Sequence, residues 1–227
     1  MSRAADLLTC LVVPERCLHC RGPAERPGAM LCHACHGALP WLPVDGCRRC
    51  GLPRPCPRGR CPSRSAPFAA AWAPLSYEGP ARTLALLGKD RAARRVAPWF
   101  AAAMVARVPA TVTDGVAAVV PVPPDPRRLR RRGEDHAALL AAAVAAALGV
   151  PRLPLLGRER SGPAQHHRTR AERLRIAAPV LLAVPPDRVL LVDDVHTTGA
   201  TARAAAAALR GGGARRVTVL TALRTLR

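Results

Sequence analysis

The chain has 227 residues and a net charge of +20, because 35 lysines and arginines face 15 aspartates and glutamates. This excess of cations predicts attraction to polyanions such as nucleic acid, a membrane surface or phosphorylated small molecules, with an inert basic surface as the alternative. No apolar run is long enough to span a bilayer, and "LLTCLVVP" near the start lacks the basic segment and the cleavage site of a signal peptide. We therefore expect a cytoplasmic protein without a membrane span.

The first part of the chain is rich in cysteine. Nine cysteines fall between residues 10 and 61, and none follows. Eight of them form close pairs, namely Cys17 with Cys20, Cys32 with Cys35, Cys47 with Cys50, and Cys56 with Cys61. Two thiolates at a tight turn can face one tetrahedral ion, and two such turns complete a site. Since this segment has few large apolar residues, metal would have to supply the folding energy that its core lacks.

The spacing predicts at least one structural Zn²⁺ site. We expect the first four paired cysteines to form one site and the last four a second. Crossed pairing stays open, and the wider spacing of Cys56 and Cys61 leaves open whether one ion binds or two. His19, His33 and His36 lie beside ligand cysteines and could replace one of them. A disulfide framework is the alternative, but it needs an export signal that the sequence does not show.

Residues 62–67 are expected to link two domains, a small zinc-binding domain with a short lead-in over residues 1–62 and a second domain over residues 67–227. In the second domain, strand-like and helical segments alternate. Strands are expected over residues 68–77, 115–123, 189–195 and 216–223, and helices over residues 80–107, 136–150 and 201–214. Such short steps from strand to helix predict an α/β fold, with a mostly parallel sheet covered by helices on both faces.

The stretch "VDDVHTTGAT", residues 192–201, follows an apolar strand and opens a helix. In a parallel sheet, ligands bind at this position, outside the carboxyl ends of the strands. Backbone N–H groups and hydroxyls at the helix N-terminus can hold a phosphate. They would come from Thr197, Thr198, Gly199, Ala200 and Thr201. Asp193 and Asp194 could then accept hydrogen bonds from sugar hydroxyls, so the stretch predicts a sugar-phosphate site, with a simple helix cap as the alternative. No nucleotide-triphosphate or dinucleotide fingerprint is present.

Several stretches carry a resemblance to a known family. "VLLVDDVHTTGAT" is similar to the motif with which type I phosphoribosyltransferases bind phosphoribosyl diphosphate (PRPP). Together with "PERCLHC", "CRRCGLP", "VVPVPPDPRRLRRRGEDHA" and "RERSGPAQHHRTRAERLR", it makes nearly the whole chain resemble the ComF family. The resemblance implies a type I phosphoribosyltransferase-like fold preceded by a double zinc ribbon.

The resemblance also implies roles for single residues. Asp193 and Asp194 would be the catalytic carboxylates on the ribose, and residues 197–201 would bind the 5′-phosphate of PRPP, which binds together with Mg²⁺. For a further set of residues, the resemblance implies either contacts to pyrophosphate or a place on a lid over residues 157–178. These residues are Lys89, Arg132, Gly133, Gln165 and Arg173. The chain departs from the family at residues 134–136, where Phe-Asn-Gln is usual, and at Ile176, where Asn is usual, so the missing amides leave the acceptor unidentified.

Two functions follow from the resemblance and the composition. In the first, the protein binds PRPP or another sugar phosphate and assists natural transformation, in which imported single-stranded DNA is handled in the cytoplasm with proteins of the DNA-uptake machinery. In the second, it is a working phosphoribosyltransferase of nucleotide or salvage-type metabolism, with the zinc ribbon as a recognition arm. Because aromatic residues make up only 3% of the chain, contact with single-stranded DNA is expected to be mainly electrostatic.

Overall fold

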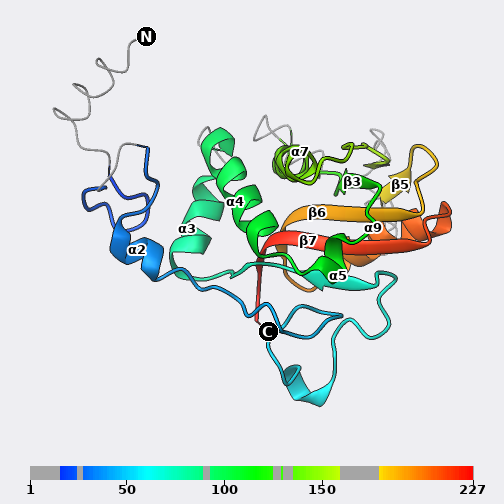
Figure 1. Ribbon diagram of the computed structural model, residues 1–227, viewed down its shortest axis with the longest axis horizontal. Coiled ribbons are helices and arrows are strands. Elements are labelled where there is room, and N and C mark those ends of the chain that lie inside the picture. Colours follow the sequence, from blue (N-terminus) through cyan, green and yellow to red (C-terminus); the bar gives the residue numbers. More distant parts are fainter. Residues whose placement is uncertain are drawn as a thin grey trace, which may run out of the picture.

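The computed structural model describes residues 16–24, 28–88, 93–124, 129, 135–158 and 179–226 (Figure 1). Five of the expected ligand contacts lie outside these residues, namely Lys89, Arg132, Gly133, Gln165 and Arg173. Most of the expected lid also lies outside them, from residue 159 to residue 178. None of the described helices is both long enough and apolar enough to cross a bilayer.

A five-stranded sheet, in which neighbouring strands pair parallel, forms the centre of the structure. In order across the sheet, the strands are β1 (Ala70–Trp72), β7 (Arg216–Arg224), β6 (Arg188–His196) and β3 (Ala118–Pro121). β2 (Leu75–Ser76) also pairs with β7, beyond the end of β1. The expected parallel sheet is therefore confirmed.

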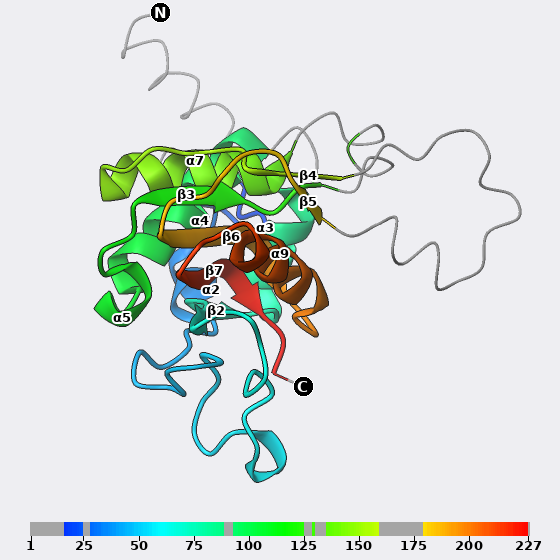
Figure 2. The ribbon, with the colours of Figure 1, turned by 90° about the vertical axis from the view of Figure 1, so that its right-hand side faces the viewer.

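Helices cover both faces of this sheet (Figure 2). They are α3 (Gly79–Leu87), α4 (Ala93–Arg107) and α7 (His136–Leu148) on one face and α9 (Ala200–Gly211) on the other. Along β6, Leu190 and Val192 belong to the first apolar cluster, whereas Val189 and Leu191 belong to the second. A strand buried on both faces needs an unbroken apolar run, and the sequence has one at residues 189–192.

Some elements differ from the expected ones. The single helix expected over residues 80–107 is wrong, because α3 ends at Leu87 and α4 is a separate helix. Gly88 caps α3, and a Cβ added there would lie 3.0 Å from Cγ1 of Val96 in α4, so glycine allows the two helices to approach closely. The sequence did not predict the short helix α5 (Ala110–Thr113) or the antiparallel pair of β4 (Leu156–Arg158) and β5 (Pro179–Leu181).

The cysteine-rich segment packs along the edge of the sheet formed by β1 and β2. It contains the short helix α2 (His33–Gly37) and a 3-10 helix, η1 (Pro57–Gly59). The N–H of Leu42 donates to the Pro74 carbonyl at 2.8 Å, and the N–H of Ala71 donates to the Arg49 carbonyl at 3.0 Å. These bonds satisfy backbone groups that an open edge would leave unpaired. The division into domains 1–62 and 67–227 stays a prediction.

Replacing Gly51 with alanine should destabilise the protein more than replacing Gly59. Both glycines have positive φ, of 71° and 68°, so either alanine carries the strain of the left-handed region, about 1–2 kcal/mol. Only at Gly51 does the added Cβ also meet backbone, 2.5 Å from the Ala71 carbonyl oxygen, whereas nothing lies within 4 Å of a Cβ at Gly59. Chemical denaturation with saturating zinc would measure both losses. Equal losses would contradict the close approach at Gly51.

Candidate functional site

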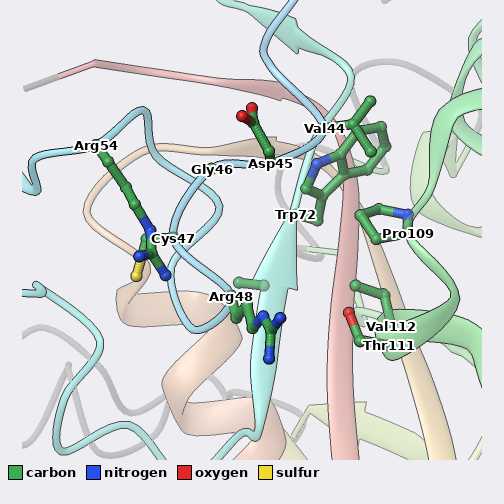
Figure 3. A pocket seen from close by; sticks show the side chains of 11 residues that line it. Val44, Asp45, Gly46, Cys47, Arg48, Arg54, Trp72, Pro109, Thr111 and Val112 are labelled. Carbon is green, nitrogen blue, oxygen red and sulfur yellow. The ribbon is translucent and has the colours of Figure 1, made fainter.

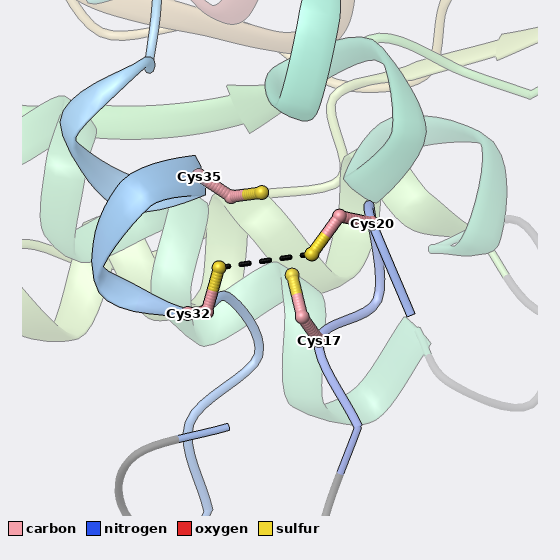
Figure 4. A group of neighbouring side chains, drawn as sticks. All are labelled: Cys17, Cys20, Cys32 and Cys35. Atoms are coloured by element: carbon pink, nitrogen blue, oxygen red, sulfur yellow. Dashed lines mark hydrogen bonds between the residues drawn. The ribbon is translucent and has the colours of Figure 1, made fainter. Parts of the chain in front are cut away.

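Four cysteines converge on one point near the start of the described chain (Figure 4). They are Cys17, Cys20, Cys32 and Cys35. Their sulfur atoms all lie within 4.8 Å of one another, and those of Cys20 and Cys32 are 3.7 Å apart. A disulfide needs about 2.05 Å, whereas a tetrahedral zinc ion with bonds of about 2.3 Å holds its sulfur ligands about 3.8 Å apart. The spacing therefore fits a four-coordinate metal ion.

A second group of the same kind follows in the chain. It consists of Cys47, Cys50, Cys56 and Cys61, whose sulfur atoms also lie within 4.8 Å of one another. The sulfur atoms of Cys50 and Cys56 are 3.7 Å apart and those of Cys47 and Cys61 are 3.9 Å apart, again the edge length of a zinc tetrahedron. The expected sequential grouping is confirmed, and so is a second group with the donors for zinc. Cysteine supplies all four positions in each group, and His19 instead places Nδ1 2.8 Å from Thr83 Oγ1.

The thiols within each group differ in acidity. Burial alone would raise the pKa of Cys17 and of Cys47, but hydrogen bonds from backbone N–H groups outweigh it and lower both values to about 6. Burial raises the pKa of Cys35 to about 12. Because a metal binds thiolates, binding of an ion would displace the protons that the less acidic thiols still hold.

The two adjacent aspartates lie inside β6 and not in a loop after it, because the strand continues to His196. Asp193 Oδ1 accepts a hydrogen bond from Asp194 N–H at 2.9 Å, and Asp194 Oδ1 accepts one from Val195 N–H at 2.7 Å. Burial, followed by the charge of Asp194, raises the pKa of Asp193 well above its ordinary value. The Asp193 carboxyl therefore loses its proton less readily than an isolated aspartate does.

Residues 197–199 turn the chain from β6 into α9. Gly199 is the N-cap with φ +76°, and the hydroxyl of the preceding Thr198 accepts a long hydrogen bond, of 3.4 Å, from Ala200 N–H. The first turn of α9 holds no acidic residue. The exposed residues around the turn are Thr197, Thr198, Ala200 and Thr201. The exposed start of this 12-residue helix can therefore receive an anion from solvent, which would replace the Thr198 hydroxyl at Ala200 N–H.

A buried basic pair lies beside the turn, and the sequence pattern did not reveal it. His196 and Arg224 are register partners on β6 and β7 and are only 5% and 4% exposed. A Cβ on Gly199 would lie 2.5 Å from His196 Nε2, so the imidazole lies against the turn. Burial, followed by the charges of Arg224 and Arg203, lowers the pKa of His196 to about 3. The imidazole is therefore neutral at physiological pH.

Residues 62–68 run from the second cysteine group to this site. Arg49 lies between two cysteines of that group, and its guanidinium donates to the carbonyls of Ser63 and Ala66 at 2.7 and 3.1 Å. Both of these residues are buried. The start of the segment is thus fixed to the turn that carries the metal ligands.

The same segment is also fixed to the candidate phosphate site. Arg203 of α9 donates to the carbonyl of Pro62. Phe68 packs edge-on against the ring of His196, with ring centroids 6.2 Å apart. Because α9 begins at the turn of residues 197–199, displacement of the second cysteine group would displace this turn as well.

We expect two zinc ions per chain, with different effects when each is lost. Cys50→Ser should remove one ion and expose the amides of residues 196–201 to hydrogen exchange, because residues 62–68 join the second group to that turn. Cys20→Ser is the matched control, since it should remove one ion and leave this exchange unchanged. Metal analysis and hydrogen exchange on the two variants would measure both effects. Equal exchange at residues 196–201 in the two variants would contradict the connection.

Acid should weaken the protein partly through His196. An unfolded histidine takes up a proton near pH 6.5, whereas His196 in the folded protein has a pKa of about 3. Its contribution to the free energy of unfolding is therefore complete above pH 6.5 and falls as the pH decreases, by at most about 1.4 kcal/mol per pH unit. His196→Gln should lose stability less steeply between about pH 6.5 and pH 5. If the free energies of unfolding of the two proteins fell equally with pH over this range, a neutral, buried imidazole would be contradicted.

Known proteins resemble the chain along almost its full length. The DNA utilization protein YhgH from Salmonella typhi is 31% identical over 229 residues, which cover 95% of this chain and 100% of the relative. The protein of that name from Salmonella typhimurium has the same identity and coverage. The solved structure of orotate phosphoribosyltransferase from Aeropyrum pernix is 24% identical, with a TM-score of 0.33 and coverage of 62% of each chain. No family model matches. By its identity to the Salmonella relatives over nearly its whole length, the chain belongs to the family of the DNA utilization protein YhgH.

Proposed function

We propose that the end of β6 and the start of α9 bind a sugar phosphate, with PRPP as the ligand that the resemblance to ComF and to type I phosphoribosyltransferases suggests. The phosphate would lie on the N–H groups and hydroxyls of residues 197–201. One observation carries the proposal: two adjacent carboxylates in a strand are followed, after the turn, by an exposed helix N-terminus without acidic residues in its first turn. A bare phosphate would need only the helix N-terminus, whereas a ribose brings hydroxyls for the carboxylates.

Asp193 and Asp194 would have two tasks in this site. They would accept hydrogen bonds from the ribose hydroxyls and so fix the sugar over the end of the sheet. Phosphoribosyl transfer breaks the bond between C1 of the ribose and a pyrophosphate oxygen, and positive charge develops on the sugar, which nearby carboxylates stabilise. Mg²⁺ bound with PRPP would neutralise the leaving pyrophosphate, and carboxylate oxygens are ligands that this cation accepts.

The residues under the turn support binding of an anion above it. Gly199 has no Cβ, so the His196 imidazole can lie directly against the turn and support it from below. Arg224 is buried on the neighbouring strand, where its positive charge is little screened by water. We also propose the contacts to pyrophosphate, or within a lid, that the resemblance implies. They would come from Lys89, Arg132, Gly133, Gln165 and Arg173.

The wider function that we propose is the handling of single-stranded DNA. The Salmonella relatives are named DNA utilization proteins, and the resemblance to ComF implies natural transformation. A net charge of +20 supports contact with nucleic-acid phosphates. The protein would then work in the cytoplasm with proteins of the DNA-uptake machinery. The acidic pair also suits a working phosphoribosyltransferase as a second candidate, and release of pyrophosphate from PRPP in the presence of acceptors would identify it.

Replacing both Asp193 and Asp194 with asparagine should weaken PRPP binding about tenfold or more, because the shape is kept while the charge is lost. Any transfer rate should fall further, since the lost carboxylates oppose the charge of the transition state. Asp187→Asn is the matched control, because this exposed aspartate lies just before β6, at its opposite end, and pairs with Arg215. Calorimetry with PRPP and with ribose 5-phosphate would measure the affinities.

A substitution in the phosphate-binding turn should affect ligand binding differently from the substitution of the two aspartates. Gly199→Val should abolish binding of both PRPP and ribose 5-phosphate, because the new Cβ would lie 2.5 Å from His196 Nε2 and valine is strained at φ +76°, so the turn that presents the N–H groups would be displaced. Circular dichroism would establish that each variant is folded. Unchanged binding of both ligands in both folded variants would show that the stretch is only a helix cap.

A further inference from the structure

A separate cavity of about 350 Å³ lies between the second cysteine group and α5 (Figure 3). Its volume lies at the lower end of the roughly 300–1,000 Å³ that small-molecule sites occupy. Apolar side chains of Val44, Pro109 and Val112 line part of it, and Arg48 and Arg54 line another part. It shares no lining residue with the acidic pair or the turn of residues 197–199.

An unused hydrogen-bond donor lies at the inner side of this cavity. Trp72, the last residue of β1, lines the cavity and is only 3% exposed, and its Nε1 has no hydrogen-bond partner among the described residues. Figure 3 shows the indole nitrogen on the side of the ring that faces Asp45 and Gly46, two other lining residues. Buried N–H groups in proteins are nearly always paired, so an unpaired one beside a cavity points to an acceptor supplied by a ligand.

The charge around the cavity favours an anion as that ligand. Arg48 and Arg54 are exposed, and in Figure 3 the carboxylate of Asp45 points away from both. Residues 44–66 contain six arginines and one aspartate. This surplus exceeds the two net negative charges of a zinc ion held by four thiolates. Guanidinium groups match the oxygens of a phosphate better than other cationic side chains do.

We propose that this cavity binds a phosphomonoester, the 5′-phosphate of a free nucleotide or of a DNA end. Trp72 donates its indole N–H to the ligand at the buried side, and Arg48 and Arg54 hold the phosphate at the exposed side. The apolar wall at Val44, Pro109 and Val112 contacts the part of the ligand beyond the phosphate. This site is distinct from the sugar-phosphate site and does not depend on it.

The indole N–H signal of Trp72 gives a local test in the full-length, zinc-loaded protein. The chain has three tryptophans, so Trp72→Phe identifies this signal by its loss in an NMR spectrum. Titration with a nucleoside 5′-monophosphate should shift the signal and saturate. Arg48→Gln with Arg54→Gln should weaken this binding about tenfold or more. Arg60→Gln with Arg64→Gln is the matched control, because it removes the same charge from exposed residues near the second cysteine group that do not line the cavity.

Oligodeoxynucleotides with and without a 5′-phosphate distinguish the two sources of the ligand. A shift with the phosphorylated strand alone assigns the site to DNA ends, and a shift with the nucleotide but neither strand assigns it to free nucleotides. Equal shifts with both strands would overturn the phosphomonoester in favour of internal phosphates. No shift with any ligand, or equal weakening by the two double variants, would overturn the proposal. Failure of PRPP binding alone would leave the Trp72 result standing, since the signal reports on this cavity.

Discussion

The close approach of Gly51 to the backbone of Ala71 is the contact on which the rest of the arrangement depends. β1 is an edge strand, and a side chain at Gly51 would drive the second cysteine group away from it. With glycine there, the carbonyl of Arg49 accepts the outward N–H of Ala71. A segment with so few apolar residues needs metal to hold its shape, and the sheet needs that segment to cover its edge. Metal binding and completion of the sheet are therefore linked.

The same link extends to the candidate phosphate site through both contacts and charge. Residues 62–68 are bonded to Arg49 on one side and to α9 on the other. Burial lowers the pKa of Arg224, and the negative charge of the second cysteine group opposes this effect. The thiolates thus help to keep a buried guanidinium charged on the strand next to His196. The second cysteine group thus lies close enough to Arg224 for its charge to act on the strand next to the turn that follows β6.

The parts of the fold that could be predicted are those that depend on local sequence patterns. The apolar run of β6 and the glycine that ends α7, Gly149 with φ 66°, are local signals, and both were predicted. The cysteine spacing likewise predicted both groups. The end of α3 at Gly88 depends on how closely α4 packs, which periodicity does not encode. Arg224 could not be predicted as buried, since arginine is mostly exposed and only the pairing of β6 with β7 places it beside His196.

The placement of the acids explains why the candidate site suits a ligand with two kinds of groups. Acidic residues are favoured in the first turn of a helix, where they interact with the free N–H groups. α9 has none there, and its N-cap is a glycine, so an external anion meets no negative charge in the first turn and competes at Ala200 N–H with the neutral hydroxyl of Thr198. The two carboxylates lie instead in β6, separated from the helix by residues 195–199. One ligand can then place an anion at the helix and hydroxyls at the carboxylates, provided that the two kinds of group are joined by a short linker. A phosphorylated sugar carries both kinds of group on one small framework.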